Sequence, residues 1–255
     1  MKTTNGMWLG SRTATLACVL VIAGCATRPA EVAEVHAGFL QGYLAATEYP
    51  DSLKLLPPPP AAGSAAFARD QEASEEALSL RGTERYDQAV RDAELMFPAA
   101  ADAFSQAVGF EITEKDTPYL YRLLRRTLTD AGLSTYAAKN NYKCSRPFMM
   151  NHEPIGSPED ENALRNDGSY PSGHTAIGWA WALILCEVVP ERTDAILARG
   201  YEFGQSRVIC NVHWQSDVDA GRIMGAAAVA RLHANQDFLA DLKQAKREVA
   251  AIRKP

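Results

Sequence analysis

The sequence predicts an all-α protein with a single domain. No stretch shows sustained alternation of apolar and polar residues between turn residues, which is the pattern of a half-buried strand. After Gly63 the apolar residues recur at helical spacing almost to the C-terminus. The 255 residues, 47% hydrophobic and 22% charged, can bury one sizeable core. We therefore expect a helical bundle without internal repeats.

Residues 1–24 resemble an export signal, because a basic start precedes a short, largely apolar segment over residues 13–23. The end of this segment, Ile-Ala-Gly-Cys at residues 22–25, resembles a bacterial lipobox, whose cysteine is diacylated and becomes the new N-terminus. We expect Cys25 to anchor an exported, periplasmic lipoprotein to the outer membrane of a Gram-negative cell. Ordinary cleavage after Ala26 is the alternative.

These signals divide the chain into three segments. We expect a signal peptide at residues 1–24, a tether with a first weak helix at 25–45, and the main helical domain at 46–255. The weak helix is predicted by apolar residues at helical spacing that begin near His36. The four prolines at 57–60 predict a stiff, extended surface segment.

Caps and breakers set the first helices of the domain. Ser64 and Thr83 are good N-cap residues, and Gly82 between them can end a helix. Pro98 interrupts the next helix. The expected helices cover residues 64–80, 83–96 and 98–108.

Two more helices follow before the first charged motif. Asp116 or Thr117 opens the first of them, with Pro118 at an early position, where proline is tolerated. These helices cover residues 117–132 and 134–143. The arginines that we expect on a solvated or salt-bridged face of the first helix are Arg122, Arg125 and Arg126.

The second half of the chain contains one long irregular segment and a buried helix. Prolines and glycines predict an irregular segment from Pro147 to Tyr170, and we expect it to line the entrance to a site. The apolar residues 175–189 predict a core helix too short to span a bilayer comfortably. Gly200 and Gly204, four residues apart, predict close helix packing. The last helices are expected at 193–208, 216–233 and 238–252.

Three charged motifs point to a phosphate site. KxxxxxxRP lies at residues 139–147, PSGH at 171–174, and SRxxxxxHxxxD at 206–217. Arginine donates two parallel hydrogen bonds to phosphate, and the N-terminus of a helix attracts anions. The expected phosphate-binding residues are Lys139, Arg146, Ser172, Gly173 and Arg207.

The third motif also contains a candidate nucleophile. His213 and Asp217 are four residues apart, so in a helical turn the carboxylate can reach one imidazole nitrogen. This contact fixes the tautomer and leaves the other nitrogen free to attack phosphorus. A lone pair of this kind is usually structural, but here it accompanies three cationic residues and a second histidine, His174.

The three motifs together resemble the signature of the phosphatidic acid phosphatase type 2 superfamily, and the resemblance covers roughly residues 45 to 245. Within it the chain is most similar to the bacterial class A non-specific acid phosphatases. The flanking segments that carry this resemblance are Leu55–Ser64, Arg81–Thr83, Asp92–Leu95 and Arg199–Cys210.

The resemblance implies a fold, an activity and residue roles. It implies a helical acid phosphatase domain with the active site between helices, and metal-independent hydrolysis of phosphomonoesters, with phosphotransfer to other alcohols also allowed. It implies that His213, oriented by Asp217, forms a phosphohistidine. His174 would protonate the leaving group and later activate water.

Three other functions agree less well with the sequence. A phosphatase of lipid or polyprenyl phosphates belongs to a branch with several membrane helices, which the mature sequence lacks. A vanadium-dependent haloperoxidase shares closely similar motifs, but the short chain and the flanking segments count against it. An envelope lipoprotein that only binds phosphate would not need His174, His213 and Asp217 together.

The residues also limit the cofactors and partners. No close His-x-x-His or carboxylate-rich pattern is present, so we expect neither a metal ion nor another cofactor. The net charge of −5 and the absence of a basic face argue against nucleic acid. The expected ligands are small phosphomonoesters, with phosphate and vanadate as inhibitors. Membrane contact is expected only through the lipid anchor, and a homo-oligomer is left open.

Three cysteines remain after Cys18 and Cys25. Cys144 and Cys210 lie inside motifs that must converge, so they are the best candidates for one disulfide in an oxidising compartment. Cys186 is expected to be a buried thiol. His152 lies in the irregular segment, where a surface role is favoured over a catalytic one.

Overall fold

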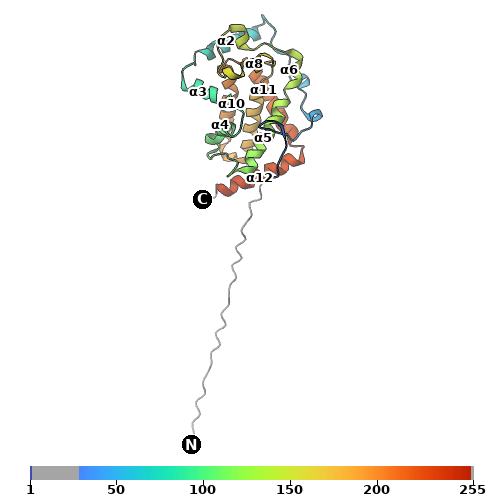
Figure 1. The fold of residues 1–255 in the computed structure, drawn as a ribbon, viewed down its shortest axis with the longest axis vertical. Coiled ribbons are helices and arrows are strands. Elements are labelled where there is room, and N and C mark those ends of the chain that lie inside the picture. The colour runs from blue at the N-terminus through green and yellow to red at the C-terminus, as the bar shows by residue number, and fades with distance from the viewer. Residues whose placement is uncertain (2–28, 254–255) are drawn as a thin grey trace.

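The computed structural model describes Met1 and residues 29–253, and this part of the chain is a helical bundle (Figure 1). The longer helices are α2 (Ala65–Leu78), α3 (Glu84–Arg91), α4 (Ala99–Val108), α5 (Pro118–Leu133), α9 (Gly173–Val188), α10 (Thr193–Ile209), α11 (Gln215–Leu232) and α12 (Gln236–Ile252). The shorter ones are α1 (Ser52–Leu55), α6 (Tyr136–Tyr142), α7 (Pro147–Asn151) and α8 (Glu161–Arg165), with 3₁₀ turns η1 (Ala46–Glu48), η2 (Pro158–Asp160) and η3 (Pro190–Arg192). The prediction of an all-α fold is confirmed.

Helix α9 lies at the centre of the bundle and packs against both α10 and α11. Residues without side chains allow this close approach. A Cβ atom at Gly200 would lie 2.5 Å from the Cβ of Ala182, and one at Gly204 would lie 2.8 Å from Cγ2 of Thr175. The predicted role of these two glycines in helix packing is therefore confirmed.

The core is formed mainly by α4, α5, α9 and α12, with further residues from α10 and α11. Trp181 of α9 is fully buried, and its Nε1 donates a hydrogen bond of 2.9 Å to the carbonyl of Leu124 in α5. The bond satisfies the one polar group of this large side chain. The predicted buried helix is thus fixed to the core by packing and by a hydrogen bond.

The weak helix expected from His36 is wrong. Glu34–His36 (β1) and Phe39–Leu40 (β2) form a short antiparallel pair instead, with Gly38 at φ 84° in the turn. The backbone N–H groups of Tyr43 and Leu44 donate to the buried carboxylate of Asp130, over 2.8 and 3.0 Å. These tertiary acceptors and the glycine turn override the helical spacing of the apolar residues.

Two boundaries in the domain also differ from expectation. Helix α3 ends at Arg91 rather than near residue 96. The segment from 147 to 170 is not wholly irregular, because it contains α7, η2 and α8. Pro147 and Pro158 occupy the start of α7 and η2, where the missing N–H of proline is tolerated. The prolines here begin short helices instead of excluding them.

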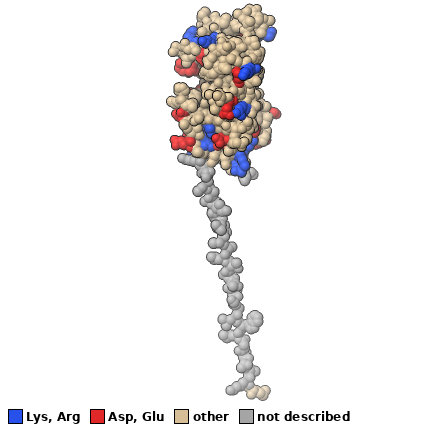
Figure 2. Space-filling model, turned by 90° about the vertical axis from the view of Figure 1, so that its right-hand side faces the viewer, with Lys and Arg blue, Asp and Glu red and all other residues tan. Residues whose placement is uncertain are grey.

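The predicted signal peptide and the lipid acceptor Cys25 lie outside the described residues, so the division of the chain at residues 24 and 45 stays a prediction. In the described part, no helix is both long enough and apolar enough to cross a membrane. The face drawn in Figure 2 carries basic and acidic side chains interspersed, without a continuous patch of one sign.

Candidate active site

The three motifs converge from five helices. Arg146 is the N-cap of α7 and Ser172 the N-cap of α9. The Oγ of Ser172 accepts the N–H of Thr175 at 3.2 Å, which fixes the start of α9. The other predicted site residues lie in α6 (Lys139), the first turn of α9 (Gly173 and His174), the last turn of α10 (Arg207), the loop before α11 (His213) and the first turn of α11 (Asp217).

The cations of the motifs are buried together. The side chain of Lys139 is 4% exposed, and Arg146 and Arg207 are each 1% exposed. Burial, and then the charge of Arg146, lowers the pKa of Lys139 to about 8. A Cβ at Gly173 would lie 4.0 Å from Cε of Lys139, so the lysine passes the N-terminus of α9.

Arg207 has donors without acceptors. Its Nε and Nη1 are buried and make no hydrogen bond within the described part of the chain. An unsatisfied buried donor costs about 1–3 kcal/mol, and more when it is charged. A bound oxyanion would remove this cost, so these two nitrogens are suited to binding an anionic ligand.

Arg146 is held mainly by backbone carbonyls. Its Nε donates to the carbonyl of Leu164 at 2.9 Å, and its Nη1 donates to the carbonyl of Val212 at 2.9 Å. The same Nη1 lies 3.1 Å from Nε2 of His213. Because a guanidinium only donates, Nε2 of His213 must be the acceptor, and its lone pair points at the arginine.

The other ring nitrogen of His213 faces Asp217. Nδ1 lies 3.1 Å from Oδ2 of Asp217, so it carries the proton and donates it. The same carboxylate oxygen accepts the N–H of Trp214 at 2.8 Å and the hydroxyl of Ser169. Burial, followed by Arg146 and the other nearby cations, lowers the pKa of His213 well below its usual value. His213 is therefore a neutral imidazole with one defined tautomer.

His174 is oriented by a backbone carbonyl. Its Nε2 lies 2.9 Å from the carbonyl oxygen of Ala93, which accepts, so Nε2 carries a proton. The ring stacks on Phe203 with 6.4 Å between centroids. Burial, and then Arg207, lowers the pKa of His174 well below its usual value. An anion bound among the cations would oppose this effect and favour protonation of Nδ1.

The helix start contributes donors as well. The hydroxyl of Ser172 accepts hydrogen bonds from both the N–H and the Oγ1 of Thr175, at 3.2 and 2.9 Å, so its own proton is left to donate. The first N–H groups of α9 have no partner within the helix. Ser172 and Gly173 can therefore donate to an anion at this point.

Sequence reasoning missed Asp167, which lies four residues before the PSGH segment. Its Oδ2 lies 3.0 Å from Nζ of Lys139 and 3.0 Å from Nη2 of Arg146. Its position two residues before Ser169 and four before the motif was the available signal, but nothing in the pattern indicated which loop carboxylate would reach the cations. The segment that contains it thus lies at the site, as expected.

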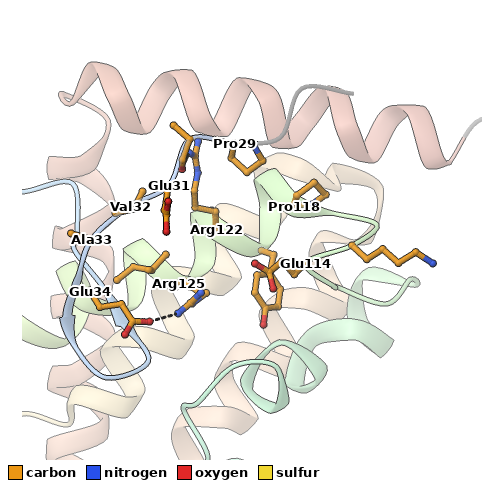
Figure 3. Close-up of a pocket in the computed structure, with 13 residues that line it drawn as sticks. Pro29, Glu31, Val32, Ala33, Glu34, Glu114, Pro118, Arg122 and Arg125 are labelled. Atoms are coloured by element: carbon orange, nitrogen blue, oxygen red, sulfur yellow. Dashed lines mark hydrogen bonds and ion pairs between the residues drawn. The ribbon is translucent and has the colours of Figure 1, made fainter. Parts of the chain in front are cut away.

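The remaining candidates lie away from this cluster. Arg122 and Arg126 pair with Asp241, and Arg125 pairs with Glu34, so these arginines form the predicted salt-bridged face. Arg122 and Arg125 also line a cavity of about 1150 Å³ beside the N-terminal segment, together with Glu31 and Glu34 (Figure 3). None of its lining residues belongs to the three motifs.

The candidate disulfide between Cys144 and Cys210 is absent. Cys144, Cys186 and Cys210 are all free thiols. Cys210 is buried, with its Sγ 3.2 Å from the carbonyl of Ala89, in a different apolar cluster from Cys144. The motifs converge through their charged side chains, whereas these two cysteines point into separate parts of the core. His152, also doubtful as a catalytic residue, is exposed.

Buried cations with free donors, beside a histidine held by a carboxylate, are groups suited to binding a phosphoryl group. Comparison with known proteins agrees. Residues 120–239 match the model of the PAP2 superfamily. The non-specific acid phosphatase of Providencia stuartii is 52% identical over 83% of this chain and 86% of its own length, and that of Salmonella typhimurium is 46% identical over 76% and 78%. An acid phosphatase of Zymomonas mobilis is 39% identical over 80% of this chain and 77% of its own.

The chain therefore belongs to the PAP2 superfamily, among relatives named non-specific acid phosphatases, and it is a phosphatase.

Proposed function

We propose that this phosphatase hydrolyses a broad range of phosphomonoesters at acidic pH, without a metal ion, through a phosphohistidine formed on His213. The observation that carries the proposal is the tautomer of His213: Nε2 carries the lone pair and accepts from Nη1 of Arg146, while Nδ1 donates to Asp217. His213 lies in the same buried cluster as Arg207, whose Nε and Nη1 have no acceptor and could donate to an oxyanion. The names of the relatives support the substrate class.

In the first step, Nε2 of His213 attacks phosphorus and the ester P–O bond breaks. The lone pair on Nε2 that attacks phosphorus is the one that accepts the hydrogen bond from Nη1 of Arg146. Arg146 must therefore first move this donor from Nε2 to a phosphoryl oxygen. Lys139, Arg207 and the donors at the start of α9 stabilise the charge on the equatorial oxygens. The positive charge that develops on His213 is stabilised by Asp217.

The leaving alkoxide takes a proton from Nδ1 of His174, and in the second step neutral His174 accepts a proton from the attacking water. The P–N bond then breaks and inorganic phosphate leaves. His174 suits both steps because the carbonyl of Ala93 holds Nε2–H, leaving Nδ1 for proton transfer. The cations that lower the pKa of His174 are neutralised by a bound substrate, which promotes protonation of His174.

Metal independence gives a direct test. Activity on p-nitrophenyl phosphate, nucleoside monophosphates and sugar phosphates should be unchanged after dialysis against EDTA, because the site already contains three cationic side chains and would repel a metal cation. The measurement is kcat/KM for the panel before and after chelation. A loss of activity that Zn²⁺ or Mg²⁺ restores would contradict metal independence.

We also propose that the protein is an exported lipoprotein anchored through Cys25. The wild-type protein should partition with membranes and detergent, because two acyl chains are enough for stable anchoring. Cys25→Ser should release the protein or stop its processing, whereas Cys144→Ser, a matched control on a free thiol, should leave partitioning unchanged. The measurement is fractionation with N-terminal sequencing. A soluble mature form of the wild type that begins after Ala26 would overturn the anchor.

A further inference from the structure

Asp167 links two cations that the proposed mechanism assigns to phosphate. One oxygen, Oδ2, lies 3.0 Å from both Nζ of Lys139 and Nη2 of Arg146. Within the described part of the chain, Asp167 is the one carboxylate that forms an ion pair with either cation. Its side chain is 33% exposed, whereas the two cations are almost completely buried. Asp167 therefore lies at the solvent side of the phosphate site.

The carboxylate changes the net charge that an incoming anion meets. Lys139, Arg146 and Arg207 are three cations, and Asp167 and Asp217 are two carboxylates. With both histidines neutral, the side chains of the site carry a net charge of only about +1 near neutral pH. Without Asp167 the charge would be about +2. A fixed negative charge raises the free energy of a bound dianion twice as much as that of a monoanion.

We propose that Asp167 is a specificity-determining residue, which biases the phosphate site towards a singly charged phosphoryl group by adding a fixed negative charge next to Lys139 and Arg146. The inference rests on the proposed function, because it concerns the same site. The favoured substrate form is the monoanion of a phosphomonoester. This form predominates below the second pKa of such esters, which is about 6.

The groups around Asp167 support this role. Lys139 and Tyr136 face it from α6, and Arg146 faces it from the start of α7. The charge of Asp217 in α11 also favours the protonated forms of these two cations, but its carboxylate accepts hydrogen bonds from His213 and Trp214. Asp167 makes no hydrogen bond with either histidine, so its substitution changes the charge of the site without removing a catalytic contact.

The test separates charge from hydrogen bonding by using two tetrahedral anions whose charges do not change over a wide pH range. Sulfate is a dianion and methanesulfonate a monoanion. Their dissociation constants are measured by calorimetry at pH 7, at constant ionic strength. This pH lies above the pKa of Asp217, about 6, and below that of Lys139, about 8. The wild-type enzyme is compared with Asp167→Asn.

We expect Asp167→Asn to bind methanesulfonate about tenfold and sulfate about a hundredfold more tightly, the order of magnitude that Coulomb's law gives for a charge a few ångströms away in partly screened surroundings. Asp167→Ala removes the same charge. The logarithm of its fold-change in affinity should therefore also be twice as large for sulfate as for methanesulfonate. Glu161→Gln is the matched control. It removes a carboxylate six residues earlier that pairs only with Arg165 at the surface, so neither affinity should change.

Equal changes for the two anions, or unchanged or weaker sulfate binding in both Asp167 variants, would overturn the inference and leave Asp167 as a structural partner of the cations. Hydrolysis of p-nitrophenyl phosphate by the same preparations separates this failure from that of the proposed function. An active wild-type enzyme without the charge-dependent difference contradicts only the role of Asp167. An inactive wild-type enzyme contradicts the proposed phosphatase mechanism itself.

Discussion

His213→Ala should lower phosphatase activity by at least about 10⁴-fold, the scale on which removal of a nucleophile acts in other hydrolases. The imidazole supplies the lone pair at Nε2, and neither Arg146 nor Asp217, its two side-chain neighbours, can replace it. In the wild type, acid-sensitive and alkali-stable phosphate should be trapped on the protein within the first turnover, and the variant should trap none. The measurement is rapid quenching with a labelled phosphomonoester.

Vanadate gives an independent check on the same residue. It can adopt the trigonal-bipyramidal geometry of phosphoryl transfer, so it should inhibit competitively and bind more tightly than phosphate. This difference should vanish in His213→Ala. His152→Ala is the matched control, because His152 is an exposed histidine outside the cluster. Retained turnover or retained phosphoenzyme in a folded His213→Ala would require a different nucleophile.

His174→Ala should lower the hydrolysis of alkyl phosphates and nucleoside 5′-monophosphates by about 10²–10⁴-fold, the usual contribution of a general acid. Hydrolysis of p-nitrophenyl phosphate should fall much less, because its leaving group departs readily as an anion. The measurement is a plot of log kcat/KM against the pKa of the leaving group. The variant should show a steeper negative slope. Equal slopes would mean that His174 only binds the phosphoryl group.

The pH dependence should agree with this assignment. The general acid works in its protonated form, so kcat/KM should fall as pH rises through the pKa of His174. Burial and Arg207 place this pKa below the ordinary value of about 6.5 in the free enzyme. The falling limb should therefore lie on the acidic side of neutrality and be absent or flatter in His174→Ala. A falling limb unchanged in the variant would assign the proton to another group.

The parts of the fold that local chemistry dictates were predictable from sequence. Ser64 and Thr83 cap α2 and α3 as expected, because a hydroxyl that accepts an N–H three residues ahead is a local interaction. The largely apolar residues 175–189 predicted a core helix, and the structure buries most of them. The motif residues converge as the resemblance implied. Their catalytic roles remain predictions until the variants above are measured.

The features that sequence did not reveal depend on contacts between distant segments. The chain near Tyr43 does not form the expected helix, because the backbone N–H of Tyr43 donates to Asp130, 87 residues away. Asp167 reaches Lys139 only because the segment between them folds back through α7 and α8. The separation of Cys144 from Cys210 likewise depends on which side of each helix faces the core. Neither the periodicity of apolar residues nor a capping residue in the sequence indicates any of these contacts.

The glycines between the central helices have a consequence for how the enzyme can change. A Cβ at Gly221 of α11 would lie 2.6 Å from the carbonyl oxygen of Ser172, and one at Gly178 of α9 would lie 2.2 Å from the ring of Phe203, on which His174 stacks. The proposed catalytic groups on α9, α10 and α11 thus keep their relative positions because glycines, which have no side chain, allow these helices to pack closely. Variation in substrate range should therefore accumulate in the loops around the site, while these glycines tolerate almost no substitution, because a single methyl group would move the reacting residues apart.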